Sequence, residues 1–326
     1  MKKARFWIGI VISVLCLYLA TRGIDFATVL SALRQVNLWW LLPVPLLLLA
    51  SLVARAYRWQ VLFYPLQGLH FGRLLNVINI GYLVSNIFPF RAGDLVRSYL
   101  IAELEKVNVG RALSTVIVDR VMDTLTIVAF LAALIPFVPL SPALMQSGRV
   151  VSVVAIGVIL VLMVLSWQKE RAMALVSAVL RRTPLNKPSI YEFIASGLDG
   201  LAVLRSPRQG PGLIASSLLI WALLALMMYC GTLAFGLSVP FAAGVAVIVF
   251  TSLGMTVPSS PGYIGVFEAL TVVALGLFGV EEGVALTYAL VMHALNYVLF
   301  AIFGLFGAWK ESISYEQLRE KVAEAG

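Results

Sequence analysis

The sequence predicts an all-α polytopic membrane protein with about six full transmembrane helices and two opposed re-entrant hairpins of half-helices. Of its 326 residues, 61% are hydrophobic and only 12% are charged, and the mean hydropathy is +0.96. Several apolar runs approach or exceed the roughly 20 residues that a helix needs to cross a bilayer. Two other apolar regions, one in each half of the chain, are interrupted by proline and glycine, as in discontinuous membrane helices.

The uninterrupted apolar runs predict the full spans. In chain order these are 6–21, 39–54, 112–137, 150–167, 213–237 and 283–309. The first run is similar to a signal peptide, but no cleavage-site pattern follows it, so we interpret it as an uncleaved first span. Tryptophans near run ends, among them Trp39, Trp59 and Trp309, fit aromatic belts at the two membrane interfaces.

The first interrupted region follows the second predicted span. Its apolar run, 74–88, has about 15 residues, or roughly 22 Å of helix, which is shorter than a bilayer core about 30 Å thick. Pro89 and Gly93 break this run, and Asp94 is suited to cap a second half-helix over 95–103. Because neither half-helix is long enough to span, we expect a re-entrant hairpin.

The second interrupted region has the same outline. An apolar run over 242–257 ends at a break, and a second run over 264–278 follows it. Irregular backbone at membrane depth is tolerated only where protein buries it or where it lines a wet cavity, so this region also predicts a re-entrant hairpin. The break contains two prolines and two glycines, namely Pro258, Pro261, Gly262 and Gly265.

Basic residues lie mainly in segments that these spans leave in the cytoplasm. The long loop 168–212 holds seven Lys and Arg residues against three acidic ones. The positive-inside rule therefore places this loop, the short charged tail 311–326 and both termini in the cytoplasm. Residues 1–310 then form one transmembrane domain whose hairpins enter from opposite sides, the outline of an inverted repeat. Eight full spans would also keep both termini inside, but would place Lys106 and Arg111 outside.

The first break carries the strongest candidate site. Ionisable groups at membrane depth are costly and mark functional sites by default. Arg91 and Arg97, with Asn86 close by in sequence, could hold a phosphate, because a guanidinium forms a two-pronged contact and a helix N-terminus favours anions. The alternative is that Asp94 only caps the half-helix and that Arg97 only extends to the interface.

Acidic residues in the next span supply opposite charge. Asp119 and Asp123 are four residues apart and share a helix face, with Arg120 beside them. They could pair with Arg91 or Arg97, or bind a proton or cation that drives transport. A structural ion-pair lock is the alternative.

Other polar residues within the apolar runs have two interpretations each. Glu268 follows the second break and could couple ions, pair with an arginine or cap its helix. Arg55 and Arg58 share a face at the cytoplasmic end of the second span, where they could gather lipid headgroups or serve only as a topology signal. His293 and Asn296 favour interhelical hydrogen bonding.

Several chemistries lack their sequence patterns. The chain has no Walker-A motif, no H-E-x-x-H, no C-x-x-C and no G-x-S-x-G, and its two His and two Cys are not spaced for a metal site. We therefore assign no catalytic residue, metal or cofactor. The net charge of +8 is explained by short basic loops, so we expect a membrane lipid as partner and no nucleic acid.

Four motifs in order resemble the lysylphosphatidylglycerol synthase transmembrane-region family, which includes flippase domains of the multiple peptide resistance factor type. The resemblance covers about residues 5 to 310 and implies an inner-membrane protein with re-entrant helices that moves or presents lipids. Unlike the synthase, this sequence shows no soluble aminoacyl-transferase domain after the spans, so lipid aminoacylation by this chain alone is not expected. The matching residues are Arg55, Arg58 and Trp59; Asn86, Pro89, Arg91, Gly93, Asp94 and Arg97; Asp119, Arg120 and Asp123; and Pro258, Pro261, Gly262, Gly265 and Glu268.

These observations together predict flippase-like translocation of a phosphate-bearing lipid across the inner membrane. Arg91 and Arg97 would receive the headgroup, while the acidic residues compensate charge or couple ions. One alternative is an integral-membrane enzyme, or a subunit beside a lipid-modifying enzyme, that acts on lipid-linked sugars or other modified lipids. A non-catalytic scaffold is the other.

Overall fold

The computed structural model describes residues 26–64, 68–88, 92–138, 208–256 and 260–314, with a few isolated residues elsewhere. All regular elements within these ranges are helices. Several predicted features lie wholly or mostly outside the described residues: the spans 6–21 and 150–167, the loop 168–212, the end of the tail, and Pro89, Arg91 and Pro258.

Four helical segments in the described ranges are long and apolar enough to cross a membrane, and they correspond to four of the six predicted spans. The second predicted span is longer than expected, because its helix continues past 54 to Leu62. The four segments are the 3₁₀ turn η1 (Leu38–Leu41) with α3 (Pro43–Leu62), α6 (Val109–Leu134) with η2 (Ile135–Phe137), α10 (Gly210–Ala234) and α13 (Glu282–Lys310).

Each interrupted region forms two shorter helices that pack on each other. The longest has 17 residues, or about 26 Å, which is less than a bilayer core of about 30 Å. The first pair is α4 (Phe71–Ile87) and α5 (Ala92–Leu104), and the second is α11 (Phe241–Gly254) and α12 (Val266–Gly276), joined through the 3₁₀ turn η4 (Pro261–Tyr263). One further helix, α2 (Phe26–Arg34), was not predicted because it is too short to read as a span.

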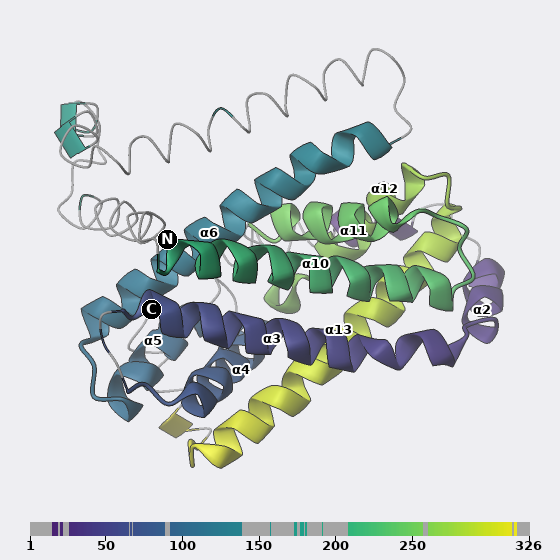
Figure 1. The fold of residues 1–326 in the computed structure, drawn as a ribbon. Helices are drawn as coiled ribbons and strands as arrows, with labels where there is room; N and C mark the ends of the chain where they lie inside the picture. Colours follow the sequence, from purple (N-terminus) through teal and green to yellow (C-terminus); the bar gives the residue numbers. More distant parts are fainter. Residues whose placement is uncertain are drawn as a thin grey trace.

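The two halves meet where α3 and α10 lie side by side and antiparallel (Figure 1). The backbone N–H of Asn37, before α3, donates to the carbonyl of Ala234, where α10 ends. The first short pair continues from the end of α3 and the second from the end of α10, so the pairs begin at opposite ends of the bundle (Figure 1). Each pair also packs on the other half's last long helix, α4 on α13 and α11 on α6.

Small residues bring α4 and α13 close together. A Cβ atom at Gly304 would lie 2.9 Å from the carbonyl oxygen of Asn79, and one at Gly307 would lie 2.8 Å from that of Asn76. Beside them, the rings of Tyr82 and Phe300 stack at 4.7 Å between centroids. Close approach at small residues is how membrane helices gain packing energy in the absence of water.

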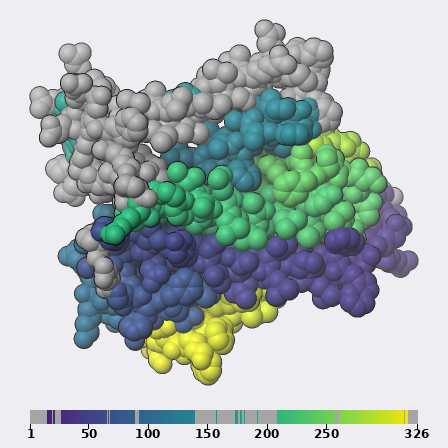
Figure 2. All heavy atoms as spheres, in the orientation of Figure 1, coloured from purple at the N-terminus to yellow at the C-terminus, as the bar shows by residue number. Residues whose placement is uncertain are grey.

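The outer surface is strongly apolar. Large side chains of the long helices are exposed, including Leu46 of α3 (70%), Leu219 of α10 (51%) and Leu305 of α13 (62%). Figure 2 shows α3 and α10 in contact along one face of the molecule. Trp39 and Trp309 are 79% and 70% exposed, in keeping with interfacial positions. Exposed apolar helix faces of this length suit contact with lipid.

Replacing Gly304 with alanine tests the α4–α13 contact. The added Cβ meets Leu83 and the Asn79 backbone, so we expect Gly304→Ala to lower the free energy of unfolding by about 1–3 kcal/mol. The matched control is Gly276→Ala, because nothing lies within 4 Å of that Cβ. Thermal unfolding in detergent measures both, and equal midpoints for the two variants would contradict the packing.

Candidate functional site

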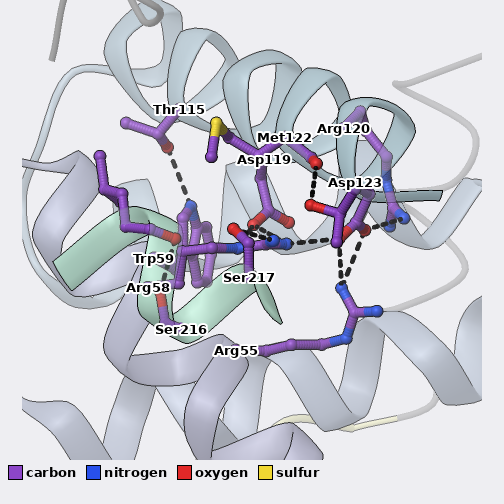
Figure 3. A network of polar contacts seen from close by, with 12 residues as sticks. Arg55, Arg58, Trp59, Thr115, Asp119, Arg120, Met122, Asp123, Ser216 and Ser217 are labelled. Atoms are coloured by element: carbon purple, nitrogen blue, oxygen red, sulfur yellow. Dashed lines mark hydrogen bonds and ion pairs between the residues drawn. The ribbon is translucent and has the colours of Figure 1, made fainter. Parts of the chain in front are cut away.

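A cluster of buried charges joins α3, α5 and α6. We call it the charged cluster, and Figure 3 shows most of it from close by. Five of its seven side chains are almost completely buried, with residue exposures between 0% and 7%. The members are Arg55 and Arg58 of α3, Asp94 and Arg97 of α5, and Asp119, Arg120 and Asp123 of α6.

Arg58 lies at the centre of this cluster. Its Nη2 is 2.7 Å from an oxygen of both Asp119 and Asp123, and its Nε donates to Asp119 at 2.9 Å. Its Nη1 donates to the hydroxyl of Ser217 on α10 at 3.0 Å. Arg55, one turn earlier, donates to both carboxylate oxygens of Asp123 at 2.8 and 3.2 Å (Figure 3).

The charges of α5 complete the cluster. Arg97 donates from Nη2 to Asp119 at 2.9 Å, and its guanidinium lies 5.1 Å from the centre of the Trp59 ring. Its Nε lies 3.2 Å from Asp94 but makes no hydrogen bond. Asp94 in turn accepts from Nε and Nη2 of Arg120, at 2.9 and 2.5 Å.

Helix periodicity explains why these charges meet. Arg55 and Arg58 are three residues apart and Asp119 and Asp123 four apart, so each pair lies on one face of its helix, and the two faces meet. Both arginines are therefore buried within α3, and a topology signal at the cytoplasmic end does not account for them. Asp94 is not the N-cap that the sequence suggested: it is the third residue of α5 and pairs with Arg97 and Arg120.

Two tryptophans support the cluster, and neither was predicted to do so. Trp59 was assigned to an aromatic belt, but it is completely buried and donates its indole N–H to Thr115 at 2.9 Å. Trp221 of α10 donates to Asp123 at 3.2 Å. Their positions in sequence could not reveal this, because the partners belong to other helices.

The charged cluster has one surplus positive charge and one accessible edge. It contains four guanidinium groups and three carboxylates. The side chains of Arg120 and Asp94 are 32% and 19% exposed, so the cluster opens on this side. Buried ion pairs are weak contributors to net stability, since desolvation offsets their attraction. Ionisable groups at membrane depth mark candidate functional sites, so the charged cluster is the candidate site of this chain.

A second polar group lies at the break of the second short pair. Glu268 accepts a hydrogen bond from the backbone N–H of Gly265 at 2.6 Å, so it caps α12. Its other oxygen lies 2.6 Å from Nδ1 of His293 on α13, and Nε2 of that ring lies 2.9 Å from the carbonyl of Gly262. The expected interhelical hydrogen bonding of His293 is thus present, whereas Oδ1 of Asn296 is buried without a partner.

Asn86, near the end of α4 and just before the first break, contacts the other half of the chain. The carbonyl of Asn86 accepts a hydrogen bond from the hydroxyl of Tyr297 on α13 at 2.5 Å, and its side-chain Nδ2 is buried without a partner. Within the described ranges, no group of three or more His, Cys, Asp or Glu residues is arranged to hold a metal ion.

The lysylphosphatidylglycerol synthase TM region family matches residues 6–304 of this sequence. The chain belongs to this family. Its relatives include a UPF0104 membrane protein of Methanothermobacter thermautotrophicus, 22% identical over 299 residues and 88% of each chain. Another is the glycosyltransferase AglD of Haloferax volcanii, which is 26% identical over 366 residues. That match covers 97% of this chain and 56% of AglD. The chain thus spans little more than half the length of AglD.

Removing one central carboxylate tests how much the ion pairs of the charged cluster contribute to the stability of the protein. Asp119→Asn leaves Arg58 and Arg97 buried with too little opposite charge, so we expect a loss of about 3–5 kcal/mol in the free energy of unfolding. The control is Glu282→Gln, an exposed carboxylate at the start of α13. Thermal unfolding in detergent compares them, and an Asp119→Asn midpoint equal to that of the wild type would show that the buried pairs are energetically unimportant.

Proposed function

We propose that this protein translocates a phosphate-bearing lipid across the cell inner membrane. The observation that carries the proposal is the charged cluster, which has one positive charge more than it can neutralise with its own carboxylates. An anionic headgroup would supply the missing negative charge. Family membership supports a role with membrane lipids in general terms.

The accessible edge indicates where a headgroup would approach. Arg120 and Asp94 form that edge, and Asp94 lies just after the first break. A phosphate could replace one oxygen of Asp94 on the Arg120 guanidinium, because both ligands fit its two-pronged geometry. As in the sequence analysis, we also assign headgroup binding to Arg91 and Arg97. The aspartates would balance the positive charge of the arginines when no headgroup is bound.

The path for the headgroup would run between the two short helix pairs. In the proposed topology both pairs are re-entrant, with both termini in the cytoplasm, and their breaks face the interior from opposite sides. Discontinuous helices in this arrangement place polar backbone near the midplane of transporters. The acyl chains would stay in the bilayer, against the exposed apolar faces of the long helices.

A second candidate function follows from AglD. Because that relative is a glycosyltransferase of nearly twice the matched length, this chain could instead serve a lipid-modifying enzyme as its membrane subunit. The two functions differ in their products: translocation leaves the lipid chemically unchanged, whereas the enzyme function produces a modified lipid.

The headgroup assignment predicts loss of bound lipid in two variants. Arg120→Gln and Arg91→Ala each remove a guanidinium from the proposed site, so purified protein should retain less anionic lipid than the wild type. Each charge-assisted hydrogen bond contributes about 1.5–3 kcal/mol, which corresponds to at least a tenfold weaker affinity. Arg34→Gln is the control, because Arg34 is an exposed residue at the end of α2. Mass spectrometry of co-purified lipid measures all three, and unchanged retention in both site variants would exclude the site.

Translocation itself is tested in proteoliposomes. We expect the wild type to speed the crossing of fluorescent phosphatidylglycerol, and Arg120→Gln to slow it toward the rate of empty vesicles. Phosphatidylcholine, which carries no net charge, should cross more slowly. A chemically altered lipid in place of transfer between leaflets would favour the enzyme-subunit function.

A further inference from the structure

The two halves carry acid–base pairs at the same positions. Asp94 is the third residue of α5, and Glu268 is the third residue of α12. Their partners, Arg120 and His293, are each the twelfth residue of the next long helix, α6 and α13. The pairs Asp94–Arg120 and Glu268–His293 therefore occupy corresponding places in the two halves, whose helices also pack in the same order.

The corresponding bases differ in one chemical property. An arginine keeps its proton in proteins, so the Asp94–Arg120 pair is always charged. A histidine is the side chain that gains and loses a proton near neutral pH. The first half thus has a fixed pair, and the second half has a pair that can change its charge.

The hydrogen bonds around His293 show how many protons its pair holds. The carbonyl oxygen of Gly262 can only accept, so Nε2 carries a hydrogen and donates it. A neutral ring then has a bare Nδ1, which faces an oxygen of Glu268 at 2.6 Å. That contact is a hydrogen bond only if one proton lies between the two atoms, on either the ring or the carboxyl group. Without it, two lone pairs would face each other and the contact would open.

No other charged group neutralises Glu268 among the described residues, so the shared proton keeps the Glu268–His293 pair neutral. Among ion pairs of the described residues, Glu268 enters only the one with His293. From α13 itself Tyr297 faces the ring, at 6.3 Å between ring centroids, and Phe267 of α12 stacks on it at 4.5 Å. No ion pair described in the structure joins a cation of the other neighbouring helices to the pair. The helix α11 has no titratable side chain, and α10 has Tyr229 and Cys230 but no charged one. Arg73 of α4 pairs with Glu105 and Glu311, and Arg34 of α2 is exposed.

The pair touches the second break and lies one helical turn from a contact beside the first break. Its hydrogen bonds join α13 to Gly262 and, through Glu268, to Gly265 in the second break. One turn further along α13, Tyr297 holds the carbonyl of Asn86, at the end of α4 before the first break. A change at His293 is therefore next to the contacts that both short pairs make with α13.

We propose that Glu268 and His293 form a proton-binding site that couples translocation to a proton gradient. One proton enters the Nδ1–Oε1 contact from water on one side, and holds the second break against α13. Its release to water on the other side leaves Glu268 with a negative charge, opens the contact and frees the break to move. The proton-binding part stands on the geometry alone, whereas the coupling part rests on the proposed lipid translocation.

The chain allows a direct measurement of proton binding, because it contains two histidines. The substitution His70→Gln removes the other histidine, whose side chain is 70% exposed beside Glu105. Nitrogen-15 spectra of histidine-labelled protein then report His293 alone. We expect the ring-nitrogen signals to change as the pH is raised across the range in which the protein stays folded, because loss of the shared proton removes the hydrogen bond between Nδ1 and Glu268. A signal that does not change over that range in folded protein would overturn the proton site.

Coupling is measured with fluorescent phosphatidylglycerol in proteoliposomes that carry a pH gradient. In the wild type and in the control His70→Gln, the crossing rate should differ between opposite gradients. In His293→Arg, which copies the fixed pair of the first half, and in Glu268→Gln, this difference should disappear. A difference that persists in both site variants would overturn coupling. A wild type that moves no lipid would overturn coupling together with the proposed function, while the histidine spectra alone would still decide the proton site.

Discussion

The arrangement of the bundle depends on the neutralisation of Arg58. Its side chain has no exposed surface, and its charge cannot be removed, so neighbouring helices must supply opposite charge and hydrogen-bond acceptors. Asp119 and Asp123 of α6 and Ser217 of α10 do so. Because an unpaired buried guanidinium is far more costly than a misplaced leucine, this requirement determines how α3, α6 and α10 pack against one another.

The same requirement anchors the first pair of short helices. Asp119 accepts from Arg97 of α5 as well as from Arg58, so a helix too short to cross a bilayer is tied to the long helices by charge. This arrangement places the first turn of α5 at the open edge formed by Asp94 and Arg120. Stability and the proposed headgroup site thus depend on the same side chains, which is common where a buried polar network also binds a ligand.

The two halves repeat their packing but not their chemistry. In each half a long helix is followed by two short helices and a second long helix, and the short pair reaches across to the other half. Among the residues that the structure describes, the first half concentrates arginine and aspartate, whereas the second half has the histidine–glutamate pair. Because the repeated fold carries different charges in its two halves, we assign the two proposed roles, headgroup binding and proton binding, to different halves.

The sequence by itself determined the membrane class, four spans that the described structure contains, the two broken regions and most residues of the charged cluster. These are local properties, since run length, proline breaks and helical spacing depend on neighbours in the chain. The tertiary structure decided the partners: Trp59 is buried against Thr115, Arg55 and Arg58 face α6, and His293 meets Glu268. Arg58 and Asp123 are 65 residues apart, and no local pattern specifies that contact. Only the packing of whole helices brings such groups together, because each buried charge must find its opposite among residues distant in sequence.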